Sequence, residues 1–125
     1  MKPNNKWIKD WRCGINPERE ERLGNEFLKV FIDFWVKSDL ENKSKSTKNR
    51  YSSALHALGG YLVKQGVSEE NEMLSADELL SDSISQGEGP LIYYSDEDWQ
   101  NELDMVSRKL YKYLKANKNQ SSSVS

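Results

Sequence analysis

The strongest constraint on the fold is the stretch from Ser44 to Gly66, which joins a polar start, an apolar stripe and a final glycine. Apolar side chains recur in it every three or four residues, the spacing that lines one face of an α-helix. The stripe consists of Tyr51, Leu55, Leu58 and Leu62. Gly66 stands where a helix C-terminal cap belongs. We therefore predict a central helix with a buried face, onto which the other helices pack.

Two further long stretches have the same periodicity. The first opens with Asn16 as a capping side chain and Pro17 at the first helical position, and its apolar stripe extends to about Lys37. The second opens at Ser95, where a serine cap precedes three acidic residues that suit the positive end of a helix dipole. Its stripe extends to about residue 116. These patterns predict one long helix on each side of the central one.

Shorter features complete the predicted domain. Trp7 and Trp11 are four residues apart and predict a helical turn that packs onto the core, because two exposed tryptophans would be a liability. A capping-box pattern predicts a short helix over 76–83. Gly59 and Gly60 each cost about 1 kcal/mol relative to alanine inside a helix. We therefore expect a neighbouring helix or ring to approach the central helix closely at that glycine pair.

These patterns predict an all-α fold, a single-domain bundle of four to five helices, three of them long and antiparallel to their neighbours. The domain covers residues 1–116, and the polar residues 117–125 are predicted to form a disordered tail. No apolar run is long enough for a membrane span, and residues 1–6 lack the apolar core of a signal peptide. With one cysteine, no internal disulfide is possible. We therefore expect a cytoplasmic protein without a membrane partner.

Charge is distributed unevenly along the chain. Residues 1–66 contain 13 basic and 8 acidic residues, residues 67–104 contain 12 acidic and no basic ones, and residues 105–125 contain 5 basic and no acidic ones. An acidic middle thus separates two basic ends, although the whole chain has a net charge of only −2. This asymmetry is the main electrostatic indication of a partner.

No motif predicts catalysis, a metal site or a cofactor. His56, the one histidine, is expected to lie largely exposed on the central helix, and a single histidine and cysteine cannot form a zinc-type site. Cys13 is interpreted as a partly buried small side chain, with a free catalytic thiol as the alternative. There is neither a phosphate-binding glycine loop nor a nucleophile elbow. We therefore predict a protein that is not an enzyme, with a small enzyme as the third-ranked alternative.

Four basic residues are the candidate nucleic-acid contacts: Lys43, Lys45, Lys48 and Arg50. They lie just before and within the start of the central helix, where the helix dipole disfavours positive charge. An anionic partner such as duplex DNA would explain their placement. An ordinary solvated basic loop is the alternative explanation.

The same region carries a pattern of polar cap, tyrosine and leucines that ends in a Tyr-Leu pair and a glycine. The matching residues are Ser44, Thr47, Tyr51, Leu55, Leu58, Tyr61, Leu62 and Gly66, after a helix from Phe27 to Trp35. Over residues 27–66 the chain resembles the SAM-like core-binding N-terminal domain of tyrosine recombinases and phage integrases. The resemblance implies DNA clamping through Lys43, Lys45, Lys48 and Arg50. The sequence at His56 departs from the family's His-x-x-Arg motif, and the chain is too short for the catalytic domain, so recombination by this chain acting by itself is not expected.

We therefore predict a small non-catalytic helical binding module that contacts duplex DNA through the basic start of the central helix. The alternative is a helical protein-interaction module that uses an acidic face or the aromatic N-terminal arm with Trp7 and Trp11. The placement of charge distinguishes the two. Convergence of both basic ends on one face would favour DNA, whereas an acidic segment covering residues 43–50 would favour a protein partner.

Overall fold

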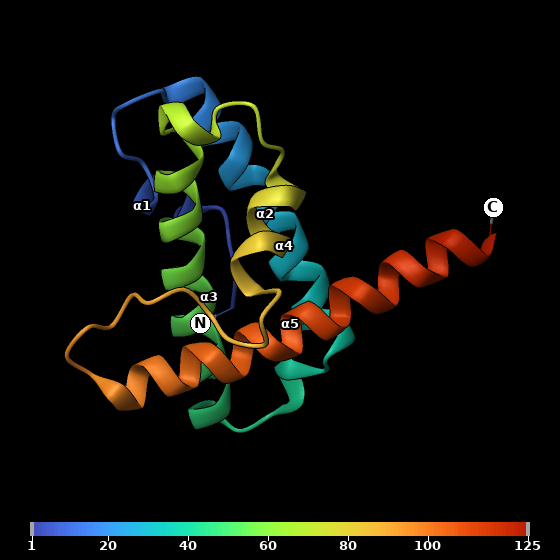
Figure 1. Ribbon diagram of the computed structural model, residues 1–125. Helices are drawn as coiled ribbons and strands as arrows, with labels where there is room; N and C mark the ends of the chain where they lie inside the picture. The colour runs from blue at the N-terminus through green and yellow to red at the C-terminus, as the bar shows by residue number, and fades with distance from the viewer. Residues whose placement is uncertain (1, 125) are drawn as a thin grey trace.

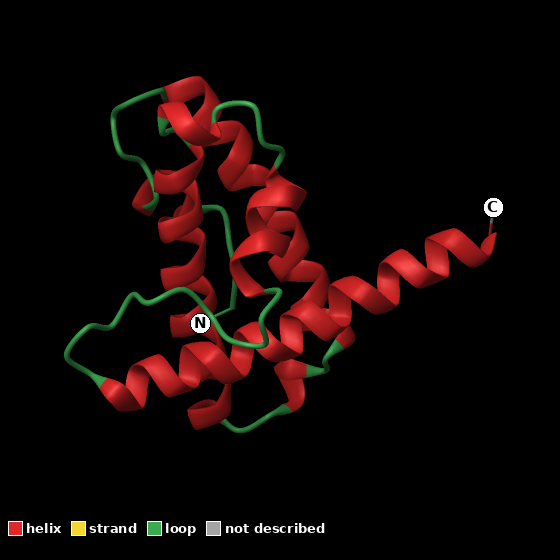
Figure 2. Cartoon of the chain, in the orientation of Figure 1, coloured by secondary structure: helices red, strands yellow, loops and turns green. Residues whose placement is uncertain are grey.

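The computed structural model describes the backbone of residues 2–124 and the side chains of residues 2–116. These residues form helices and loops and no strand (Figures 1 and 2). The α-helices are α1 (Lys6–Asp10), α2 (Pro17–Lys37), α3 (Lys45–Gly66), α4 (Ala76–Ile84) and α5 (Glu97–Val124), and the short 3₁₀ helices are η1 (Leu40–Asn42) and η2 (Glu69–Asn71). The predicted all-α fold with three long helices is confirmed. No helix within the described range is both long and apolar enough to cross a membrane.

Side chains at the helix starts explain where the helices begin. The Asn16 side chain accepts a hydrogen bond from the Arg19 backbone N–H at the start of α2, with Pro17 at the first helical position. At the start of α4, Ser75 and Glu78 exchange the two hydrogen bonds of a capping box. These local contacts are the ones that the sequence patterns predicted.

The three long helices had been predicted to be antiparallel neighbours. Only two of them are. α2 and α3 run antiparallel side by side, whereas α5 crosses them and its end projects beyond the bundle (Figure 1). α4 lies against α2 and α3 on the viewer's side. Short loops force successive helices to be antiparallel neighbours, but α4 and the long loop 85–96 separate α3 from α5. That connection leaves α5 free to take the angle that its apolar stripe requires.

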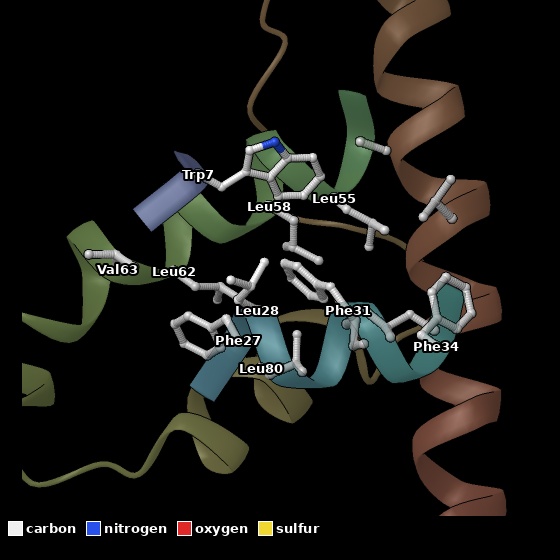
Figure 3. Packing of buried hydrophobic residues seen from close by; sticks show 14 of the residues in the cluster. Trp7, Phe27, Leu28, Phe31, Phe34, Leu55, Leu58, Leu62, Val63 and Leu80 are labelled. Carbon is white, nitrogen blue, oxygen red and sulfur yellow. The ribbon is translucent and has the colours of Figure 1, made fainter. Parts of the chain in front are cut away.

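The core lies where these helices meet. Figure 3 shows the rings of Phe27 and Phe31 on α2 facing the leucines of α3, whereas Phe34 points toward α5 and packs against Tyr113. Leu55 and Leu58 are fully buried, as predicted from the central stripe. α5 adds Leu103, Val106 and Leu110, and α4 adds Leu80 and Ile84.

The N-terminal arm packs onto the glycine pair of α3. Trp7 and Trp11 are buried, and the Trp11 indole N–H donates to the backbone carbonyl of His56 at 2.9 Å. A Cβ atom on Gly59 would lie 2.6 Å from Cε2 of Trp11, which is closer than side chains tolerate. Close approach of a ring at Gly59-Gly60 was the prediction, and it is confirmed.

Gly66 has a different role from the predicted cap. α3 continues through Gly66, and its backbone is not in the left-handed region that a glycine cap adopts. A Cβ atom there would lie 2.5 Å from Cδ1 of Leu23 and 2.9 Å from Cδ1 of Leu79. The glycine therefore allows close packing of α3 against α2 and α4, and the prediction of a C-terminal cap was wrong.

The last part of α5 coincides with the predicted tail. The helix spans Glu97–Val124, whereas side chains are described only to residue 116 and Ser125 lies outside the described residues. Disorder of residues 117–125 stays a prediction.

Candidate functional site

The start of α3 brings the four predicted basic residues to one place. Ser44 caps the helix by accepting a hydrogen bond from the backbone N–H of Thr47 at 3.2 Å. Lys43 and Lys45 are exposed on either side of this cap and form no ion pair with a described side chain. The helix start itself was predicted from the sequence.

The other two basic residues have acidic partners. Nζ of Lys48 lies 4.0 Å from Oε1 of Glu41, and Nε of Arg50 lies 3.7 Å from Oε1 of Glu102 on α5. The hydrogen bond from the Trp35 indole to Glu41 lowers the pKa of that carboxyl, so it stays ionised beside Lys48. Two of the four candidate cations are therefore partly neutralised within the chain.

The two basic ends of the chain do not meet. α5 carries Arg108, Lys109, Lys112 and Lys115 toward the end that projects from the bundle (Figure 1). Lys115 is thirteen residues beyond Glu102, the partner of Arg50, and therefore about 20 Å farther along the helix. Arg108 also donates to the backbone carbonyl of Gly87 and so fixes the loop before α5. The charge pattern is thus not a continuous basic surface.

The acidic segment, residues 67–104, runs from the end of α3 across one side of the molecule to the first turns of α5. α4, the loop after it and the first turns of α5 lie on the viewer's side of α2 and α3 in Figure 1. Of its twelve carboxylates, Glu102 is the one that forms an ion pair with a described side chain. Exposed carboxylates without such a pair are Glu69, Glu70, Glu72, Asp77, Glu78, Asp82, Glu88, Asp96, Glu97 and Asp98. This side of the protein therefore carries largely uncompensated negative charge.

Exposed apolar side chains are interspersed among these acids. They are Met73, Leu91, Tyr94 and Trp99. Tyr94 is 83% exposed and Trp99 is 41% exposed, whereas the other three tryptophans are each 3% exposed. An acidic surface that also exposes aromatic rings offers both charge and apolar area to a partner.

The loop that carries two of these residues is fixed by polar side chains of α5. Oε1 of Gln100 accepts hydrogen bonds from the backbone N–H groups of Ile92 and Tyr93, and Nε2 donates to the carbonyl of Pro90. Asp104 accepts from the Gly89 N–H at 3.0 Å. Burial and, second, the charge of Asp96 raise the pKa of Tyr93, whose phenol therefore stays neutral. The sequence patterns did not reveal these contacts, because their partners are loop backbone groups.

Arg19 fixes the other end of the acidic segment. Its guanidinium donates to the backbone carbonyls of Gly66, Asn71 and Leu74 at 2.7, 3.1 and 2.8 Å. The arginine thus ties the start of α2 to the end of α3 and to the loop that contains η2. This role could not be predicted from the sequence, because a lone arginine near a helix start has no distinguishing pattern.

His56, the chain's one histidine, lines a cleft between the N-terminal arm, α3 and the loop at Tyr93. The volume of this cleft is about 620 Å³. Nε2 of His56 is 3.0 Å from Oδ2 of Asp10, and the Trp7 ring packs edge-on against the imidazole. His56 had been predicted to be largely exposed. In the structure it is half-buried. Ser52 and Ser53 also line the cleft, but among the described residues neither hydrogen-bonds to His56. The pair joins α1 to α3, without the nucleophile–base contact of a catalytic triad.

Cys13 is exposed as a whole residue and so less buried than predicted, although neighbouring groups shield its sulfur in part. Burial of the sulfur and, second, the nearby Glu20 charge raise the pKa of its thiol, the opposite of an activated nucleophile. The neighbouring Glu20 is the buried group here. Its carboxylate accepts backbone N–H bonds of 2.7 to 3.2 Å from the four residues Cys13, Gly14, Ile15 and Asn16. Cys13 and Glu20 therefore have a structural rather than a catalytic role here.

Comparisons with protein-family models, with curated proteins and with solved structures found no match. Within the described residues, no group of three or more His, Cys, Asp and Glu side chains is placed to hold a metal ion. The surfaces of this chain are therefore the basis on which its function is inferred.

Proposed function

We propose that this chain is a non-catalytic protein-interaction module whose acidic face, residues 67–104, binds a basic segment of a partner protein. The observation that supports it is the set of twelve carboxylates with one ion pair among the described side chains, on a surface that also exposes Tyr94 and Trp99. Like charges on one face repel one another, and a cationic partner relieves that repulsion while burying the aromatic rings. The Trp7/Trp11 arm is not the proposed surface, because both rings are buried in the core.

The proposal is tested with a Lys- and Arg-rich peptide whose affinity is measured at 50 and 500 mM salt. We expect binding at low salt that weakens as salt rises, because exposed charges are screened. Replacing Glu69, Glu70 and Glu72 by Gln should weaken binding. The matched control replaces Glu18, Glu21 and Glu26 on α2, which removes the same charge outside the acidic face. Equal weakening by both triple variants, or no binding at 50 mM salt, would contradict the proposal.

A second candidate function, DNA binding at the start of α3, is favoured by one specific observation. Lys43 and Lys45 are exposed beside the Ser44 cap and have no acidic partner among the described side chains. Backbone N–H groups at a helix start and unpaired lysines are both suitable contacts for phosphate. The resemblance of residues 27–66 to the core-binding domain of tyrosine recombinases supports the same candidate. It ranks second because Arg50 and Lys48 already have carboxylate partners.

A further inference from the structure

A small hollow lies where the start of α5 meets α3. It is lined by Arg50, Asp98, Trp99 and Glu102 and has a volume of about 190 Å³. Pockets for drug-sized molecules have volumes of roughly 300–1,000 Å³. This hollow, which we name the Trp99 hollow, is therefore suited to one side chain of a partner rather than to a metabolite.

The lining of the Trp99 hollow is chemically suited to a cation. Trp99 exposes part of its indole, the aromatic ring that attracts cations most strongly. Asp98 and Glu102 add two carboxylates on the same side of α5. A guanidinium matches such a site better than an ammonium does, because it is planar, stacks on aromatic faces and donates in a fork to carboxylates.

The aromatic part of the site is held in place before any partner arrives. The Tyr93 ring packs against Trp99, with 6.2 Å between the ring centroids. The backbone of Tyr93 is fixed in turn by its hydrogen bond to Gln100, the residue that follows Trp99 on α5. A preorganised site loses less side-chain freedom on binding than a mobile one does.

One guanidinium, that of Arg50, already lines the hollow. Nε of Arg50 is 3.7 Å from Oε1 of Glu102, longer than the 2.7–2.9 Å of a tight charge-assisted hydrogen bond. The Arg50 side chain is also 56% exposed, so water surrounds much of it. The chain thus contains its own weakly held example of the group that the site accepts.

We propose that the Trp99 hollow is the specific recognition site on the acidic face and that it binds one arginine side chain of a basic partner, in competition with Arg50. The inference rests on the proposed protein-interaction function and specifies its ligand. Binding of the partner's guanidinium displaces Arg50 from Glu102. It also covers the exposed part of the Trp99 ring.

The test uses two acetylated and amidated peptides of equal length, one of Arg-Gly repeats and one of Lys-Gly repeats. Affinities are measured at 50 mM salt, and the Trp99 indole N–H resonance is followed by NMR, with Trp99→Leu assigning that signal. We expect the arginine peptide to bind more tightly and to shift the Trp99 signal. Trp99→Leu should weaken its binding about threefold, the effect of losing one exposed cation–π contact. Asp98→Asn with Glu102→Gln should weaken it further.

The Arg50→Gln variant gives the most specific test, because it removes the side chain that competes for the hollow. We expect it to increase affinity for the arginine peptide about threefold, whereas Arg22→Gln, an equal change of charge on α2, should have a much smaller effect. Circular dichroism checks that each variant is folded. Unchanged binding by the Trp99 and Asp98/Glu102 variants, or equal effects of Arg50→Gln and Arg22→Gln, would overturn the inference while leaving the proposed function standing. Failure of both peptides to bind the wild type would overturn both.

Discussion

Gly59 marks the point where the absence of a Cβ atom decides how the N-terminal arm packs. The indole of Trp11 occupies the space that this atom would take, and its N–H is bonded to the backbone of His56. The ring is therefore held from two sides and has little room to move. Replacing an ordinary glycine inside a helix by alanine raises the stability of the helix. At Gly59 the added methyl group would instead meet a rigid ring.

We predict that Gly59→Ala lowers the free energy of unfolding by about 1–3 kcal/mol, the usual cost of overpacking a core. Gly60→Ala is the matched control, because its Cβ atom would lie 3.2 Å from Cδ1 of Trp11 and needs only a small adjustment. Urea denaturation of both variants measures the difference. A Gly59→Ala variant as stable as wild type would mean that Trp11 does not pack there in solution.

The role of Glu20 in the folded protein depends on the charge of its buried carboxylate. Burial would raise the pKa of its carboxyl, but the four backbone N–H groups that bond to it outweigh this effect and lower the pKa. A lowered pKa means that the ionised carboxylate stabilises the folded protein. This contribution is present above the pKa of an unfolded glutamate, about 4.3, and is lost as the pH falls below that through the folded value.

We predict that Glu20→Gln destabilises the protein by about 2 kcal/mol at pH 7, because hydrogen bonds to a charged acceptor are lost. The difference from wild type should shrink as the pH falls below about 4, where the wild-type carboxyl becomes protonated. Urea denaturation from pH 7 to pH 3 measures this, with Glu21→Gln as an exposed control. A difference that does not vary with pH would contradict the role given to the charge.

Arg19 connects elements rather than filling a place in the core. Its three hydrogen bonds join the first turn of α2 to the last carbonyl of α3 and to the loop around η2. Carbonyls at a helix end carry partial negative charge, so a cation there is favourable. The first part of the acidic face thus takes its position from a basic residue far away in the sequence.

We predict that Arg19→Lys increases amide hydrogen exchange across residues 67–75 and lowers the free energy of unfolding by about 1–2 kcal/mol, because one ammonium cannot serve three carbonyls in this fork. Hydrogen-exchange mass spectrometry checks the first part and urea denaturation the second. Arg22→Lys, on the same helix, should change neither. An unaltered exchange pattern in the Arg19 variant would show that the loop is held by other contacts.

The distribution of charge over the protein ranks the two candidate functions. The acidic face is almost uncompensated within the described side chains, whereas the basic start of α3 retains two lysines without acidic partners. Binding to duplex DNA depends on salt through the number of phosphates neutralised, with a slope of about −0.9 for each. The number of free cations therefore sets the salt dependence.

If DNA binding occurs, we predict a log–log salt slope of about −1.8, for Lys43 and Lys45, rather than the −3.6 of four independent cations. Fluorescence anisotropy with labelled duplex DNA measures the slope. Lys43→Glu with Lys45→Glu should remove binding without loss of stability. Lys109→Glu with Lys112→Glu on α5 is the control for charge. No binding at 50 mM salt would eliminate the nucleic-acid candidate and leave the acidic face as the proposed surface.

Helix positions could be predicted because they depend on neighbours in the sequence. Each of these features involves residues only about three or four positions apart in the chain. They are the cap at Asn16, the capping box at Ser75 and the stripe through Leu55. The close approach at Gly59 was also foreseeable, since an unfavourable residue inside a helix needs a packing reason. The predicted basic residues do lie together at a helix start for the same local reason.

The tertiary structure decided what depends on residues far apart. Trp11 lies on Gly59, Arg19 on the carbonyl of Gly66, and Glu102 beside Arg50, each partner at least forty residues from the other. No local pattern encodes these pairs, because they arise from the crossing of α5 and the packing of loops onto helices. Sequence therefore determined which surfaces carry charge. Packing determined which of those charges neutralise one another and which remain open to a partner.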